Sequence, residues 1–130
     1  MGKGKTCVVR YGELYHSMGR TVLMTIKQIC DTYSLSYEEL KQKLPDEIAN
    51  HGDQFTQEPV VFKKMSELKE IEKEPKARFF YKEPIFLEKD GFNIVVSNQW
   101  TKDNFKEFCD TVEKEFSIEI EMLDAEGEKI

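Results

Sequence analysis

One stretch of the chain, residues 78–123, constrains the fold more than any other. It begins with an aromatic, extended run and reaches Asp90-Gly91, after which a second apolar run covers residues 92–97. An Asp-Gly pair tolerates the positive φ that a tight hairpin turn needs. Pro84 lies inside the first run and has no backbone N–H to donate to a neighbouring strand, which predicts a sheet edge, a bulge or a break there. The pattern predicts two antiparallel strands joined at Asp90-Gly91.

The second half of this stretch changes period twice. Apolar residues recur at the spacing of one helix face, and Thr101 or Asp103 is the candidate N-cap of that helix. Residues 117–122 then alternate polar and apolar, as in a half-buried strand. The apolar face of the predicted helix consists of Phe105, Phe108, Cys109, Val112 and Phe116.

The preceding residues extend this order. Residues 60–62 are a short apolar run that favours a strand, and Met65, Leu68 and Ile71 follow at helical spacing before Pro75. Residues 60–123 therefore predict β-α-β-β-α-β, the ferredoxin-like order of a split βαβ unit. The expected fold class is α+β.

The N-terminal part predicts a strand at residues 7–11 and two helices packed on that sheet. The first helix starts near Thr21, and the second follows Ser36, which forms a capping box with Glu39 and ends near Pro45. We expect a single domain, 1–130, with a helical lobe at about 1–48, an α/β lobe at about 60–123 and a frayed tail at 124–130. Residues 49–59 are the expected loop between the lobes.

Composition narrows the class of protein. A chain of 130 residues with 39% apolar and 34% charged residues suits one globular domain. No apolar run approaches the roughly 18 residues that span a bilayer, and no secretory signal is visible. Cys7, Cys30 and Cys109 lie far apart without a Cys-x-x-Cys motif, which favours neither a disulfide framework nor a zinc site. We expect a cytoplasmic protein with no membrane association, metal or cofactor.

Charge is distributed unevenly along the chain. Residues 1–29 carry five basic residues against Glu13 alone, whereas residues 101–130 carry four basic and ten acidic residues, and the whole chain has a net charge of −6. An acidic chain is poorly suited to non-specific nucleic-acid binding. A basic N-terminal face remains possible, and an acidic C-terminal third equally suits a basic protein partner.

The sharpest candidate for a binding site is Asn98-Gln99-Trp100. These residues follow a predicted strand and precede a predicted helix, where loops often carry binding residues. Asn and Gln can hydrogen-bond base edges, and Trp can stack on a base. The alternative is that Trp100 fills the core and Asn98 caps the corner.

A second candidate lies on the first hairpin strand. If Phe80 faces the core, Phe79 and Tyr81 face the other side, beside Arg78 and Lys82. Exposed aromatic rings among cations are typical of a platform for single-stranded nucleic acid. The alternative is that the N-terminal helices cover this second face.

Two further functions are disfavoured. The helix after Ser36 carries four acidic residues against Lys41 and Lys43, whereas a DNA-reading helix in the major groove should not be net acidic. Cys30 and Cys109 fall on apolar helix faces and are expected to be inert, and no phosphate-binding glycine loop is present. We therefore expect no enzyme and no catalytic residue.

The run Val95-Val96-Ser97-Asn98-Gln99-Trp100, followed by Asn104-Phe105 and Phe108, resembles a small, poorly characterised bacterial module. Such modules occur alone or beside restriction-type and other DNA-modifying proteins. The resemblance covers about residues 35–122, and its most specific piece is the V-x-N-Q-W corner; the family usually has Gly where this chain has Thr101. It implies a DNA-transaction or defence context in bacteria or phage, without a defined activity or catalytic residue.

These observations lead to one hypothesis and one alternative. The hypothesis is a non-enzymatic binding module in a nucleic-acid or defence-related context. The alternative is a small acidic adaptor or inhibitor that binds a protein, such as a nucleic-acid-processing enzyme, through the C-terminal third. The expected contact surface of the binding module is Arg78, Tyr81, Asn98, Gln99 and Trp100.

Overall fold

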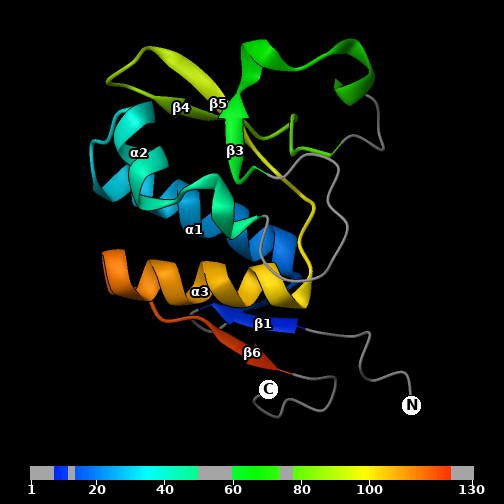
Figure 1. Cartoon of the computed structure of the whole chain (residues 1–130), viewed down its shortest axis with the longest axis vertical. Helices are drawn as coiled ribbons and strands as arrows, with labels where there is room; N and C mark the ends of the chain where they lie inside the picture. Colours follow the sequence, from blue (N-terminus) through cyan, green and yellow to red (C-terminus); the bar gives the residue numbers. More distant parts are fainter. Residues whose placement is uncertain (1–7, 12–13, 50–59, 74–77, 124–130) are drawn as a thin grey trace.

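The computed structural model describes residues 8–11, 14–49, 60–73 and 78–123. They form a mixed α+β fold in which the α-helices lie between two small antiparallel sheets (Figure 1). Helix α1 (Met18–Thr32) contacts helix α3 (Lys102–Phe116), strand β1 (Val8–Tyr11) of one sheet and strand β4 (Ile85–Leu87) of the other. The long helices are therefore the layer that joins both sheets.

The first sheet contains β1 (Val8–Tyr11), β2 (Leu14–His16) and β6 (Glu121–Leu123) in the order β2-β1-β6. Val9 lies opposite His16 on one side and Met122 on the other. The predicted N-terminal strand is confirmed from Val8 to Tyr11. Its pairing joins the beginning of the chain to the last described strand.

The second sheet contains β3 (Phe62–Lys64), β5 (Phe92–Val96) and β4 (Ile85–Leu87) in the order β3-β5-β4. Strands β4 and β5 form the predicted hairpin, with Leu87 opposite Phe92. Gly91 adopts a φ of 76°, a left-handed conformation that a side chain would strain. The Asp90-Gly91 turn is thus confirmed.

Hydrogen-bonding side chains define where the α-helices begin. The capping box of α2 (Tyr37–Lys43) pairs Ser36 with Glu39, as the sequence predicts. At α3, Thr101 is the N-cap and Asn104 completes its capping box. The hairpin turn is fixed to α2, because the Asp90 carboxylate accepts the Tyr37 backbone N–H at 2.5 Å.

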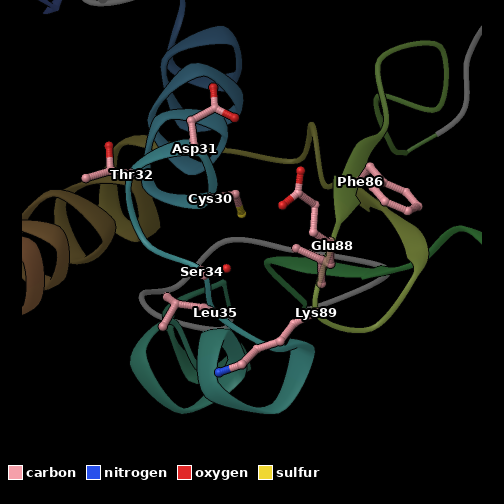
Figure 2. Close-up of a pocket in the computed structure, with 9 residues that line it drawn as sticks. Cys30, Asp31, Thr32, Ser34, Leu35, Phe86, Glu88 and Lys89 are labelled. Carbon is pink, nitrogen blue, oxygen red and sulfur yellow. The ribbon is translucent and has the colours of Figure 1, made fainter.

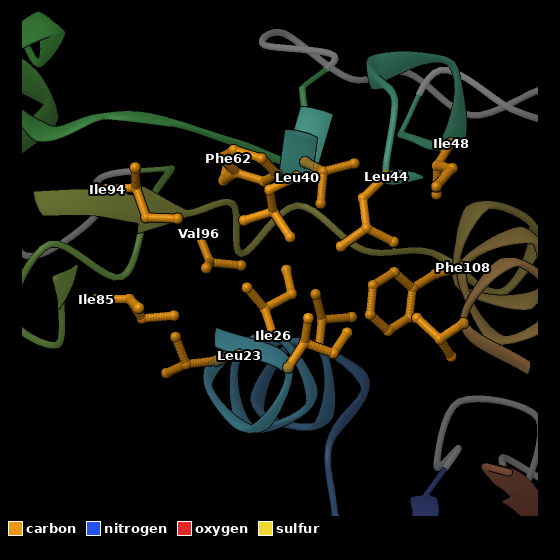
Figure 3. Close-up of a cluster of buried hydrophobic side chains, with 14 of the residues drawn as sticks. Leu23, Ile26, Leu40, Leu44, Ile48, Phe62, Ile85, Ile94, Val96 and Phe108 are labelled. Carbon is orange, nitrogen blue, oxygen red and sulfur yellow. The ribbon is translucent and has the colours of Figure 1, made fainter. Parts of the chain in front are cut away.

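One buried cluster joins the helices to the second sheet (Figure 3). Burial of such side chains contributes roughly 1.5–3 kcal/mol each relative to exposure. The cluster draws residues from both predicted lobes, so they share a core. Its largest fully buried side chains include Phe62, Phe105, Phe108, Ile26, Ile29, Leu40, Leu44 and Ile94.

The ferredoxin-like order is not confirmed. The strand after α3 pairs with β1 in the first sheet, whereas β3, β4 and β5 form the second. Residues 117–120 alternate as predicted, and Ile118 and Ile120 pack against the helical core, but only Glu121–Leu123 is a strand. Alternation indicates half-burial and contains no information on the pairing partner.

Two predicted elements differ from the structure. The helix expected after Met65 is replaced by two short 3₁₀ turns, η3 (Met65–Glu67) and η4 (Glu70–Lys73). Of its three apolar residues Leu68 is buried, whereas Ile71 is 73% exposed, so only part of the predicted helix face is covered. The strand expected over 78–86 is interrupted: Phe79 makes one bridge to Ser97, and β4 begins only after Pro84. Residues 50–59 of the predicted loop 49–59 and the tail at 124–130 lie outside the described residues.

Candidate functional site

Backbone hydrogen bonds tie the Asn98-Gln99-Trp100 corner and the preceding Ser97 to two other segments of the chain. The Asn98 backbone N–H donates to the Arg78 carbonyl at 2.9 Å, and the Ser97 N–H donates to the Val61 carbonyl at 2.9 Å. The Gln99 N–H donates to Ser97 Oγ at 3.1 Å. The corner therefore continues the second sheet before the chain turns into α3.

Trp100 is held from within this corner. Its Nε1–H donates to the Ser97 carbonyl at 2.7 Å, and its ring lies 5.5 Å from the Phe108 ring, centroid to centroid, in an edge-to-face arrangement. The side chain is partly buried and packs against the main core. An indole that packs on the core and whose N–H is hydrogen-bonded stabilises a fold. These contacts are the ones expected if Trp100 fills the core.

Asn104 is the fully buried polar residue beneath the corner, and the sequence did not single it out as a site residue. Its Oδ1 accepts the Thr101 backbone N–H at 2.8 Å. Its Nδ2 donates to the carbonyls of Ala49, at 3.2 Å, and Gln99, at 3.4 Å. The signal that could have identified it is its place three residues after an N-cap Thr, where a side chain can reach back.

Residues 78–83 run beside the corner with their aromatic rings on alternate sides. The Phe80 N–H donates to the Val96 carbonyl at 2.8 Å, and its ring packs against the main core. Phe79 and Tyr81 belong to a second cluster, on the other side, with Leu68 and Val95. The expected alternation is thus present, but residues of the 3₁₀ segment, rather than the N-terminal helices, pack against this face.

A surface hollow of about 370 Å³ lies where this segment meets α1 and the corner. It brings together two of the predicted site residues, Tyr81 and Asn98, whereas Arg78, Gln99 and Trp100 are outside its lining. We call it the Asn98 hollow, and it is lined by Arg20, Phe79, Phe80, Tyr81, Lys82, Glu83 and Asn98.

Cations stand over the aromatic rings of this region. The ammonium of Lys82 lies 5.9 Å from the centre of the Tyr81 ring, and that of Lys63 lies 4.8 Å from the centre of the Phe79 ring. The Arg20 guanidinium lies 5.8 Å from the centre of the Phe80 ring. Distances of this kind allow cation–π attraction, so the region combines positive charge with aromatic surface.

Arg20 reaches the hollow because α1 approaches closely there. A Cβ at Gly19 would lie 3.2 Å from the Phe80 ring, so the glycine makes room for that ring. Arg20 forms a bidentate pair with Glu83, whose second contact joins Nη2 to Oε1 at 3.2 Å. Hydrogen bonding between the two side chains is the main cause of both pKa shifts: it lowers the pKa of Glu83 and raises the pKa of Arg20.

A second hollow, of about 210 Å³, separates the end of α1 from the β4–β5 hairpin (Figure 2). Cys30 points into it from α1, and Glu88 projects toward it from the hairpin. Burial, with a smaller contribution from Asp31, raises the pKa of the Cys30 thiol to about 11. The thiol is therefore protonated at neutral pH and is a poor nucleophile.

Within the described residues, His, Cys, Asp and Glu side chains form no group of three that could hold a metal ion. None of the helices in this part of the chain is long and apolar enough to cross a membrane. The site and fold define a small α+β protein with a cationic, aromatic hollow. Comparison of the chain with models of known families, with curated proteins and with solved structures found no match.

Proposed function

We propose that the protein is a non-enzymatic binding module that acts in a nucleic-acid context and holds single-stranded DNA at the Asn98 hollow. The observation that supports this most is the combination of groups that meet there. Asn98 supplies an amide, the partly exposed Tyr81 supplies a ring, and Lys82 supplies a cation.

Each of these groups has a role in binding an unpaired nucleotide. An aromatic side chain that stacks on a base contributes roughly 1–3 kcal/mol per base. An amide can pair with the donor and acceptor atoms of a base edge, and ammonium groups neutralise phosphates. Arg20 and Lys82 against Glu83 give the lining of the hollow an excess of one positive charge in a chain whose net charge is −6.

The proposal is tested by fluorescence anisotropy with a labelled single-stranded oligonucleotide of about 12 nucleotides, within the range that one such site covers. We expect Tyr81→Ala and Lys82→Ala each to weaken binding about tenfold, the value of one stacked base or one lost phosphate contact at low salt. Lys106→Ala is the matched control, because Lys106 is exposed on α3 and outside the lining of the hollow.

Two results would end the proposal. One is an absence of measurable binding at about 50 mM salt, where phosphate contacts are strongest. The other is equal weakening by Lys82→Ala and by the Lys106→Ala control, which would mean that the oligonucleotide senses net charge and not this hollow.

A specific observation also favours the acidic-adaptor alternative. A hollow of about 320 Å³ lies between α2 with η2 (Asp46–Ile48) and α3, and its lining contains Glu47, Glu107, Asp110 and Glu115. Lys43 pairs with Glu115, with 3.3 Å between Nζ and Oε1. The excess of carboxylates suits a basic protein surface. A synthetic Arg- and Lys-rich peptide should bind, and Glu107→Gln with Asp110→Asn should weaken it; an unchanged affinity would exclude this surface.

A further inference from the structure

The Arg20–Glu83 ion pair lies in the lining of the Asn98 hollow. It joins α1 to the segment that follows Tyr81, far away in sequence. Both partners remain accessible, with 43% of the Arg20 side chain and 51% of the Glu83 side chain exposed. A ligand entering the hollow can therefore reach either group.

Glu83 stands among several cations. Arg20 holds its carboxylate in a two-pronged contact, and the charge of Lys27 adds to the lowering of the Glu83 pKa. Lys82, the preceding residue, lines the same hollow. Glu83 is therefore an anion in a setting whose nearest charges favour an anion.

We propose that Arg20 is the phosphate anchor of the single-strand site, and that Glu83 occupies in the free protein the position which a DNA phosphodiester takes on binding. This inference rests on the proposed function and adds that the Glu83 carboxylate competes with a DNA phosphate for Arg20. The planar guanidinium presents the same fork of N–H donors to a carboxylate and to a phosphate. A phosphate oxygen pair can thus replace the two Glu83 oxygens without a change in the position of Arg20.

The neighbours of Arg20 keep it ready for this exchange. Its guanidinium lies over the Phe80 ring at 5.8 Å, and Gly19 allows that ring to sit against α1. When Glu83 leaves, Arg20 retains the contact with Phe80. Glu83 then weakens binding twice, because it must be displaced and because its charge repels the phosphate.

The test compares wild-type protein with Glu83→Gln, Arg20→Gln and the double variant in the same anisotropy assay. Glu88→Gln is the charge-matched control, since Glu88 is exposed at the other hollow. We expect E83Q to bind the oligonucleotide about fivefold more tightly than E88Q, the ratio that corresponds to one exposed ion pair. In the R20Q background the same E83Q change should give a smaller gain than in the wild-type background, because only the repulsion of the phosphate by Glu83 is then removed.

The outcomes separate this inference from the function on which it rests. If the wild-type protein binds and Lys82→Ala weakens it, but E83Q equals E88Q, Glu83 is not a competitor and only the inference fails. The same holds if E83Q gains affinity equally with and without Arg20. If neither wild-type protein nor E83Q binds, both proposals fail. Circular dichroism of each variant verifies folding, and the exposed pair contributes little to stability.

Discussion

Substitution of Trp100 tests whether the corner is part of the folding core. Trp100→Ala removes an indole that packs edge-to-face on Phe108, and it removes the N–H that the Ser97 carbonyl accepts at 2.7 Å. Truncation of a buried Trp costs about 3–5 kcal/mol, and a partly buried one lies near the lower end. We expect a loss of about 3 kcal/mol in the free energy of unfolding.

The matched change is Trp100→Phe, which keeps a ring against Phe108 and removes the hydrogen bond. The Ser97 carbonyl then loses a partner, at a cost of about 1 kcal/mol. Both variants are measured by urea denaturation followed by far-UV circular dichroism, since the signal must not depend on the indole. A loss below about 0.5 kcal/mol for Trp100→Ala, the range of ordinary surface substitutions, would refute the structural role.

Two other predictions concern buried groups. Asn104→Ala should cost about 2 kcal/mol in urea denaturation, because a helix cap and two donated hydrogen bonds are lost together. Asn104→Asp should cost at least as much, because it keeps the capping oxygen but buries a carboxylate oxygen against the carbonyls of Ala49 and Gln99, and a cost below that of Asn104→Ala would contradict the donor role of Nδ2. Cys30, in a variant whose other two cysteines are alanine, should react with iodoacetamide at neutral pH about a hundredfold more slowly than a free thiol, since a pKa of about 11 instead of 9.0 lowers its thiolate fraction by that factor. A fast reaction of Cys30 at neutral pH would contradict the burial of its thiol. Because this thiol ionises at lower pH in the unfolded chain than in the folded protein, its contribution to the free energy of unfolding is full below pH 9 and is lost between pH 9 and about 11.

Local signals in the sequence predicted the elements whose ends are determined by their own residues. The capping box at Ser36 and Glu39, the turn at Asp90-Gly91 and the apolar face of α3 all depend on groups a few positions apart. In each case the sequence contains both partners of the interaction. The break at Pro84 belongs to the same class, because the proline itself lacks the donor.

The elements that depend on distant partners were not predictable in the same way. Ile71 has helical spacing with Met65 and Leu68, but it is exposed while Leu68 is buried, and a short helix with so small a buried face is marginal. The strand after α3 pairs with β1, more than a hundred residues away, and its alternation fits any sheet. Strand β2 was not expected at all.

The candidate site shows the same division. The sequence placed Tyr81 and Asn98 in the contact surface, and both line the Asn98 hollow. It did not indicate Arg20 or Glu83, which are 63 positions apart and meet only because Gly19 lets α1 approach Phe80. As contact residues for a ligand, all five residues of the predicted surface stay predictions: Arg78, Tyr81, Asn98, Gln99 and Trp100.

The central claim is that the Asn98 hollow binds single-stranded DNA through phosphate and base contacts. The most direct test is the affinity of wild-type protein for the labelled oligonucleotide over a series of salt concentrations. Each phosphate contact should contribute about −0.7 to the slope of log affinity against log salt, and Lys82→Ala should remove one such contribution. An affinity that does not change with salt, or a slope that Lys82→Ala leaves unaltered, would contradict the claim.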